Sequence, residues 1–331
     1  MRFDKTALTA LAMALVLAAC GTENAPQSPS GLPSGGEEAG ASSLAEPKEA
    51  VLTDSLGSQI SLPRNPRVVC LYGSYSDAWL SAGGTLAGTT EDAVKERGLD
   101  VGDAEIVGTV KEPSAEKIIA LEPDVVILSA DVAAQQDMVD VLESAGLPCL
   151  SYRVDDFSDY AAMMEQFCQA TGQPERYQET AGKAEARMKA AKEAYGFAAG
   201  QGPRVLLMRA FSTGVKAKTD DELAGAILKD LGCQNIADEH PSMLEDLSLE
   251  EVIEAGPEFI FVTTMGSEEK ALAYLDSLMA NNPAWSGLEA VKEGRYLVLP
   301  KELFHYKPNA RWGESYEYLG RLLHGQEPDL D

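Results

Sequence analysis

The chain contains the same unit twice, at a fixed offset of 134 residues. The first copy spans residues 113–127 (PSAEKIIALEPDVVI) and the second spans residues 247–261 (LSLEEVIEAGPEFIF). In each copy a serine precedes a helical stretch, a proline with an acidic neighbour ends it, and an apolar run typical of a buried strand follows. Such a unit buries its apolar side only by packing helix on sheet, so two copies predict two similar α/β lobes.

Further apolar runs surround each copy and supply additional strands. Residues 67–71 and 204–208 precede the two copies, and residues 146–150 and 294–298 follow them. Strands that alternate with helices pair in parallel. We therefore predict an α/β fold of two Rossmann-like lobes with parallel sheets. The N-terminal lobe is expected over residues 50–157 and the C-terminal lobe over residues 199–331.

The segment between the lobes, residues 158–198, contains one strong helical pattern. Pro174 suits a first helical turn and Gly196 suits a helix end. Apolar residues recur in steps of three and four at positions 177, 181, 184, 188, 191 and 195. A helix over 174–195 is about 33 Å long, which is enough to run across two lobes. The pattern predicts a single long bridging helix that limits the movement of the lobes to small tilts.

The N-terminal residues are typical of an export sequence. Two basic residues precede an apolar run over 6–19, which is too short for a permanent membrane span, so residues 1–19 are predicted to be a signal peptide. The run ends in Leu-Ala-Ala-Cys and resembles a bacterial lipobox, which implies that Cys20 receives the lipid; an ordinary cleavage site is the alternative. Residues 20–49 are rich in Gly, Ser, Pro, Ala and Glu and predict a flexible tether.

Composition excludes several classes of function. The chain has 27 Lys and Arg against 53 Asp and Glu, a formal net charge of −26, which argues against binding to nucleic acid or to anionic lipid. It contains no CxxC, HExxH, GxSxG or Walker sequence, so we do not expect an enzyme or a cofactor. Its three His residues are scattered, which disfavours a bare metal site. Cys70, Cys149, Cys168 and Cys233 are expected as buried thiols, with disulfides left open.

The body of the chain resembles the solute-binding proteins of ABC importers for iron complexes, haem and cobalamin. The similar segments are residues 51–63, 67–69, the two repeated units, 282–285 (NPAW), 288–298 and 309–312 (NARW), and together they cover about Val51 to Leu323. The resemblance implies two Rossmann-like lobes, a rigid bridging helix and a ligand in the cleft between the lobes. It also implies that the protein docks on an ABC permease dimer with its ATPase subunits.

Candidate ligand contacts follow the expected strands, because the carboxyl ends of parallel strands carry the binding loops. They are aromatic and cationic side chains from both lobes: Tyr72, Tyr75, Tyr152, Arg153, Arg209, Lys216, His305 and Tyr306. Cations in so acidic a chain suit an anionic ligand, such as a ferric catecholate or the propionates of haem. His305 is either a ligand to haem iron or a hydrogen-bonded histidine at the rim of the cleft.

The two repeated units each place a carboxylate in the first turn of their helix, at Glu116 and Glu250. Stabilisation of the helix dipole explains such a residue without any further role. Glu251 is expected to complete a capping box with Ser248. The resemblance instead assigns Glu116 and Glu250 to docking, one on each lobe, against the two halves of the permease.

These observations predict an extracytoplasmic lipoprotein that is held at the membrane by its lipid anchor alone. It would capture an iron complex, either a ferric siderophore or haem, and deliver it to an import permease. A cobalamin-binding protein of the same transporter type is the alternative. An enzyme on the same two-lobed fold is a third, because a fold alone does not decide function.

Overall fold

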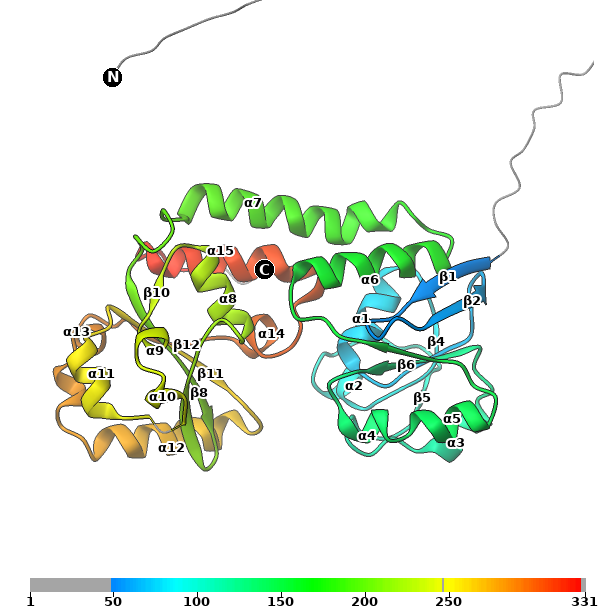
Figure 1. Cartoon of the computed structure of the whole chain (residues 1–331), viewed down its shortest axis with the longest axis horizontal. Coiled ribbons are helices and arrows are strands. Elements are labelled where there is room, and N and C mark those ends of the chain that lie inside the picture. The colour runs from blue at the N-terminus through cyan, green and yellow to red at the C-terminus, as the bar shows by residue number, and fades with distance from the viewer. Residues whose placement is uncertain (1–48, 246, 329–331) are drawn as a thin grey trace, which may run out of the picture. The chain divides into compact units, whose positions relative to one another are not determined.

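Two five-stranded sheets form the centres of the two halves of the protein (Figure 1). The computed structural model describes residues 49–245 and 247–328. The predicted signal peptide, Cys20 and the tether up to residue 48 lie outside the described residues. Of the helices that are described, none has both the length and the apolar content to cross a membrane.

The N-terminal sheet is entirely parallel, with the strand order β5-β4-β3-β6-β7. Its strands are β3 (Val68–Cys70), β4 (Leu86–Thr89), β5 (Glu105–Ile106), β6 (Val125–Ser129) and β7 (Cys149–Tyr152). Val68 and Cys70 pack into one core cluster while Val69 packs into another on the opposite face. Both faces are therefore covered, which explains why these strands are continuous apolar runs.

Helices and one hairpin surround this sheet. The helices are α1 (Gly73–Ser81), α2 (Asp92–Lys95), α3 (Ala115–Ala120), α4 (Ala133–Gln136), α5 (Val139–Ser144) and α6 (Phe157–Ala170). The hairpin consists of β1 (Glu49–Thr53) paired antiparallel with β2 (Gln59–Pro63), over the segment 51–63 that carries part of the resemblance. Asp54, at the hairpin turn, accepts the amide of Ser151 at 2.9 Å and so attaches the hairpin to β7.

The C-terminal sheet has the order β10-β8-β11-β12 in parallel, and β9 pairs with β8 in the antiparallel direction. Its strands are β8 (Arg204–Phe211), β9 (Gly214–Lys218), β10 (Gln234–Asn235), β11 (Phe259–Thr264) and β12 (Tyr296–Val298). Among the described strands of the two five-stranded sheets, only β9 departs from the predicted parallel arrangement. The turn between β8 and β9 is two residues long, and a connection this short joins antiparallel strands only.

The helices of this half include short ones at the ends of the strands. They are α8 (Leu223–Asp230), α9 (Ile236–Glu239), α10 (Ser242–Glu245), α11 (Leu249–Ala255), α12 (Glu268–Ala280), η2 (Trp285–Gly287), α13 (Glu289–Lys292), α14 (Lys301–Phe304), η3 (Asn309–Arg311) and α15 (Trp312–Leu323). A separate core cluster of this half includes Leu206, Met208 and Ile260 on one face of the sheet. The first cluster of the N-terminal half continues into the other face, through Leu207 and Phe261.

The two copies of the repeat form equivalent elements, α3 followed by β6 and α11 followed by β11. Ser114 caps α3 by accepting the amide of Lys117, and Ser248 caps α11 by accepting the amide of Glu251 at 3.3 Å. The predicted capping box is only half present, because the carboxylate of Glu251 accepts the hydroxyl of Ser242 at 2.9 Å. The repeat therefore forms the same local structure twice, at the offset of 134 residues that the sequence indicates.

The connecting segment is helical, with a π-helical part η1 (Gln178–Gly182) that leads into α7 (Lys183–Tyr195). The apolar residues that recur in steps of three and four along this segment face inward, since Ala181, Ala184 and Ala191 are buried. Figure 1 shows α7 beside α15, and a Cβ added at Gly320 would come within 2.7 Å of the Tyr195 side chain. Glycine therefore permits the close approach of the two helices. A stiff connection between the lobes stays a prediction.

The chain returns to the N-terminal half just before α15, in the segment from His305 to Asn309. The Nδ2 atom of Asn309 donates to the Ser74 carbonyl and to Oδ2 of Asp77, both at 2.7 Å. The guanidinium of Arg97 donates to the Lys307 carbonyl at 2.9 Å. Three residues of the N-terminal half, Ser74, Asp77 and Arg97, are thus tied to a segment more than 200 residues further along the chain. We call residues 305–309 the crossing segment.

The four cysteines of the described chain are buried and free. Burial raises the pKa of Cys70, Cys149 and Cys233 to about 12, because the thiolate would lose its hydration. These residues therefore act as small apolar side chains in the core. Of the two alternatives left open by the sequence, the structure has the buried thiols.

Candidate functional site

A large cleft lies where the two sheets present the carboxyl ends of their central strands. In the N-terminal sheet the strand order reverses between β3 and β6, and in the C-terminal sheet it reverses between β8 and β11. Tyr72 and Ser129 at the ends of β3 and β6, and Arg209 and Met265 at the ends of β8 and β11, all line the cleft. Ligands of open α/β sheets bind at such reversal points. Its volume is about 990 Å³.

The aromatic wall of the cleft starts from Tyr72. The chain turns sharply after this residue, and Asp92 accepts the amide of Gly73 at 2.8 Å. A Cβ at Gly73 would lie 2.7 Å from the Asp92 carboxylate and 2.9 Å from the Ala93 nitrogen, so only glycine fits here. This close contact fixes the backbone next to Tyr72 and so the position from which Tyr72 faces the cleft.

Tyr75 and Tyr152, predicted as ligand contacts, lie instead beneath this wall. Their side chains are 1% and 3% exposed, and the hydroxyl of Tyr75 donates to the Tyr152 carbonyl at 2.9 Å. The ring centroids of Tyr72 and Tyr75 are 5.1 Å apart in an edge-on arrangement. The two residues belong to the core because α1 and β7 turn them inward. They support Tyr72 and are not part of the cleft lining.

Gln135 organises the same wall and was missed by the sequence analysis. Its side chain is fully buried; Oε1 accepts the Ser129 amide at 2.8 Å, and Nε2 donates to the Leu71 carbonyl at 2.6 Å and to the Val110 carbonyl at 3.0 Å. One amide group thus joins the ends of two neighbouring strands to a third loop. A lone glutamine in a short helix carries no pattern that identifies this role from sequence.

The opposite wall contains an ionic cluster centred on Glu222. Arg209 forms an ion pair with Glu222, and Nζ of Lys218 lies 3.1 Å from the same carboxylate. Arg209 lines the cleft as predicted. Lys216 does not, because it lies on β9 directly across from Arg209 and is exposed. Arg153 also lies outside the lining and forms a 2.6 Å ion pair with Asp131, which does line the cleft.

The crossing segment contributes His305 and Tyr306 to the lining, as predicted. Burial, with the charges of Arg209 and Lys301 nearby, lowers the pKa of His305 to about 4, so its imidazole is neutral at physiological pH. Its Nδ1 atom is buried and has no partner among the described residues. Burial and the carboxylate of Glu96 raise the pKa of Tyr306 to about 12, which keeps the phenol protonated.

Further polar and apolar groups complete the lining. Seven carboxylates and five cationic side chains face the cleft, with the indole of Trp312 and the ring of Phe304. The acidic residues are Asp92, Glu96, Asp131, Asp155, Asp220, Asp221 and Glu222; the basic residues are Arg97, Lys111, Arg209, Lys301 and Lys307. The sequence analysis singled out cations as candidate contacts of an anionic ligand; the structure places carboxylates beside the cations that line the cleft.

Glu116 and Glu250 lie apart from the cleft, each exposed in the first turn of its helix. They do not belong to the cleft lining. Their positions in α3 and α11 are equivalent in the two halves, since each lies two residues after the capping serine. The structure thus gives each half one exposed carboxylate at the same place.

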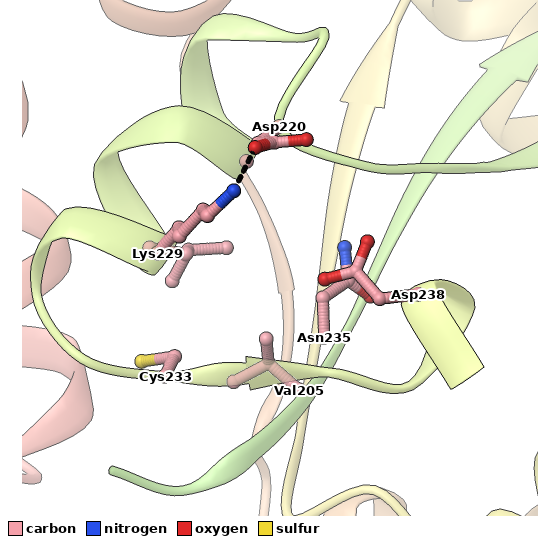
Figure 2. A pocket seen from close by; sticks show the side chains of 8 residues that line it. Val205, Asp220, Lys229, Cys233, Asn235 and Asp238 are labelled. Atoms are coloured by element: carbon pink, nitrogen blue, oxygen red, sulfur yellow. Dashed lines mark hydrogen bonds and ion pairs between the residues drawn. The ribbon is translucent and has the colours of Figure 1, made fainter. Parts of the chain in front are cut away.

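Neither a second pocket nor a cluster of metal-ligating side chains offers another site of the cleft's size among the described residues. Figure 2 shows a small hollow in the C-terminal half, lined by Val205, Cys233 and Asn235 and bordered by the ion pair of Lys229 with Asp220. Its volume of about 10 Å³ holds no more than one water molecule. Over residues 49–245 and 247–328, no group of three or more His, Cys, Asp and Glu side chains is placed to hold a metal ion.

Solved structures with the same fold include several transport proteins. The iron uptake ABC transporter substrate-binding protein PiuA from Streptococcus pneumoniae is 20% identical over 84% of this chain and 99% of its own, with a TM-score of 0.66. SirA from Staphylococcus aureus, solved with staphyloferrin B, is 22% identical over 84% and 99%, with a TM-score of 0.60. The periplasmic haem-binding protein RhuT from Roseiflexus is 20% identical over 78% and 98%, with a TM-score of 0.63.

The similarity to these proteins shows a shared fold. No curated protein matches the chain. A family model described as periplasmic binding protein matches residues 68–303, a range that begins at β3 and ends within α14. This range contains both sheets and most of the cleft lining. The chain therefore belongs to the family of periplasmic binding proteins.

Proposed function

We propose that this protein is an extracytoplasmic solute-binding lipoprotein that captures an iron complex in the cleft and delivers it to an ABC import permease. The observation that carries the proposal is the cleft itself, with a volume of about 990 Å³ and walls from both halves of the chain. Ligand pockets in proteins usually measure roughly 300–1,000 Å³. The cleft therefore suits a large ligand better than a bare ion, which needs a few donor atoms and little space.

The composition of the walls supports a planar or partly apolar ligand. Tyr72, Phe304 and Trp312 supply aromatic surface, while Ser74 and Ser129 supply hydroxyls between them. A chelated iron offers both apolar ligand framework and polar oxygen atoms. PiuA is an iron uptake protein, SirA was solved with staphyloferrin B and RhuT binds haem, and these proteins suggest this class of ligand for a chain of the same fold.

Haem is the second candidate, and His305 supports it. Its imidazole is neutral, its Nδ1 is buried without a partner among the described residues, and it lines the cleft. A neutral imidazole nitrogen is a common ligand of haem iron. Tyr306 is a poorer candidate, because its raised pKa makes loss of the phenol proton on binding to iron less favourable. In the siderophore alternative, His305 accepts or donates a hydrogen bond at the cleft wall.

Binding to a set of iron complexes tests the proposal. Purified protein is mixed with haemin, with ferric hydroxamate and catecholate complexes, and with cobalamin; bound ligand is measured by ultrafiltration and by quenching of tryptophan fluorescence. Trp312 lines the cleft, so a ligand there should quench its emission. We expect one-to-one binding of an iron complex that is recovered unchanged. Tight binding of cobalamin alone would favour the alternative transporter, and conversion of the ligand would favour an enzyme.

Delivery to the permease is proposed to use Glu116 and Glu250. One exposed carboxylate in each half can contact both halves of a two-fold permease at the same time. The double variant Glu116→Gln with Glu250→Gln should bind ligand normally but fail in uptake by proteoliposomes that contain the permease. The matched control is Glu254→Gln, a change of the same kind further along α11. Normal transport by the double variant would leave the two residues as stabilisers of their helices.

A further inference from the structure

Arg209, on the C-terminal wall of the cleft, is already neutralised within the protein, and so is Lys218 beside it. Glu222 lies at the start of α8, and both Arg209 and Lys218 form ion pairs with its carboxylate. The side chains of Arg209, Lys218 and Glu222 are only 12%, 23% and 15% exposed. Such partly buried pairs are poorly screened by salt, so the Arg209 charge is committed to its partner.

The other charged groups of the lining are mostly paired as well. Arg97 lies 3.0 Å from Asp77, Lys307 lies 4.0 Å from Asp155, and Asp131 pairs with Arg153. Among the described residues of the lining, Lys111 and Lys301 have no ion-pair partner, but Lys111 is exposed and Lys301 donates to the Gly266 carbonyl at 2.6 Å.

Two carboxylates balance these lysines. Asp92 accepts the Gly73 amide and the Thr90 hydroxyl, and Glu96 lies beside the Tyr306 phenol. Neither has a cationic partner in the part of the chain that the structure describes. The cleft therefore presents no surplus of positive charge to an incoming ligand.

We propose that Glu222 determines the preferred charge of the ligand, so that the cleft binds neutral and cationic iron complexes most tightly and discriminates against multiply anionic ones. This inference rests on the proposed function and reverses the expectation from the sequence, which took Arg209 as available to an anion. An anionic complex at this wall would meet the Glu222 carboxylate or would have to displace it from Arg209 and Lys218. Either event costs free energy that a neutral complex does not require.

The field of the whole protein acts in the same direction. The formal net charge of −26 lowers the local concentration of anions around the cleft and slows their association. A local cluster of free cations could overcome this field, as happens in many sites for anions. Glu222 forms ion pairs with both Arg209 and Lys218, so these two cations do not supply a free cluster of positive charge at the cleft.

A series of ferric complexes that differ in charge tests the inference on the wild-type protein. The probes are a neutral trihydroxamate, a trihydroxamate with one added ammonium group, and a tris-catecholate with three negative charges. At low ionic strength we expect the first two to bind at least about tenfold more tightly than the third. Added salt should narrow this difference, because it screens the repulsion of the anion.

The role of Glu222 is tested by Glu222→Gln, which removes one negative charge, leaves Arg209 without its carboxylate and leaves Lys218 with only Asp221, at 3.9 Å. We expect affinity for the tris-catecholate to rise about tenfold, with little change for the neutral complex. The matched control is Glu239→Gln, which also removes a carboxylate paired with an arginine, Arg204, in the same half of the protein. Glu239 does not line the cleft, so the control should bind all three probes as the wild type does.

The outcomes separate this inference from the proposed function. If the tris-catecholate binds the wild type as tightly as the neutral complex, the inference is overturned while the proposed function stands. If folded Glu222→Gln gains no affinity for the anion, Glu222 is not the determinant. If Glu222→Gln does not fold, the charge series on the wild type still decides whether anions are disfavoured. Failure of every iron complex, haemin included, would instead overturn the proposed function.

Discussion

Asn309, in the crossing segment, is expected to hold the two halves of the protein together. It is 3% exposed, and its Nδ2 atom donates to the Ser74 carbonyl and to the Asp77 carboxylate, both at 2.7 Å. Its backbone φ is 51°, a left-handed conformation that glycine adopts without strain and alanine does not. Asn309→Gly therefore removes the two hydrogen bonds without adding backbone strain.

The size of the effect follows from these contacts. A neutral hydrogen bond contributes about 1 kcal/mol and one to a charged group about 1.5–3 kcal/mol. The Oδ1 atom of Asn309 is buried without a partner among the described residues, so its removal offsets part of the loss. We expect Asn309→Gly to lower the free energy of unfolding by about 2–3 kcal/mol, and Asn309→Ala by about 1 kcal/mol more because of φ.

Urea denaturation followed by circular dichroism measures this change, and the melting temperature should fall by roughly 5–10 °C. Asn65→Gly is the matched control. Asn65 also has a left-handed φ, of 53°, but it is exposed. Its replacement should change the free energy of unfolding by less than about 0.5 kcal/mol. An equally small change in Asn309→Gly would refute the idea that this side chain ties the halves together.

Three further predictions concern His305, the four buried cysteines and Cys20. The pKa of His305 falls from 6.5 to about 4 on folding, so its contribution to stability is complete above pH 6.5 and is lost as the pH falls toward 4; His305→Gln should flatten the pH dependence of urea unfolding in this window. Cys70, Cys149, Cys168 and Cys233 should resist a thiol reagent at pH 8 and react only in denaturant, because burial raises the pKa of each thiol to 11 or above; rapid reaction of the native protein would contradict their burial. Cys20→Ala should move the protein from the membrane to the soluble fraction, since the segment after it has no long apolar run; retention in the membrane would argue against a lipid anchor.

The repeat allowed most of the architecture to be predicted. Its two helices and strands occur at the offset that the sequence indicates, because a capped helix, a proline break and a buried strand are local features. The antiparallel strand β9 was not predicted, although Val215 and Ala217 alternate with Lys216 and Lys218 as in a half-buried strand, because the run is only five residues long. Its place depends on pairing with β8, which is a tertiary interaction.

The strand ends that were predicted to carry the binding loops line the cleft, but the charge pairing within it was not predicted. Tyr72, Arg209, His305 and Tyr306 were expected in the lining and lie there, because strand ends are recognisable in the sequence. Tyr75 and Tyr152 have the same residue type and a similar place in the chain, yet they face the core. The pairing of Arg209 with Glu222 joins β8 to α8 across 13 positions, and no local pattern indicates it. The charge balance of the cleft therefore follows from the structure and could not be predicted from the sequence.

The position of bound iron tests the central claim most directly. Crystals grown with the complex that binds most tightly in solution would be measured at the iron absorption edge, where anomalous scattering locates the metal without reference to the chain. The account predicts a single iron inside the cleft, between Tyr72 in the N-terminal half and the crossing segment with His305 and Tyr306. Iron at the outer surface of either half, with the cleft empty, would contradict it.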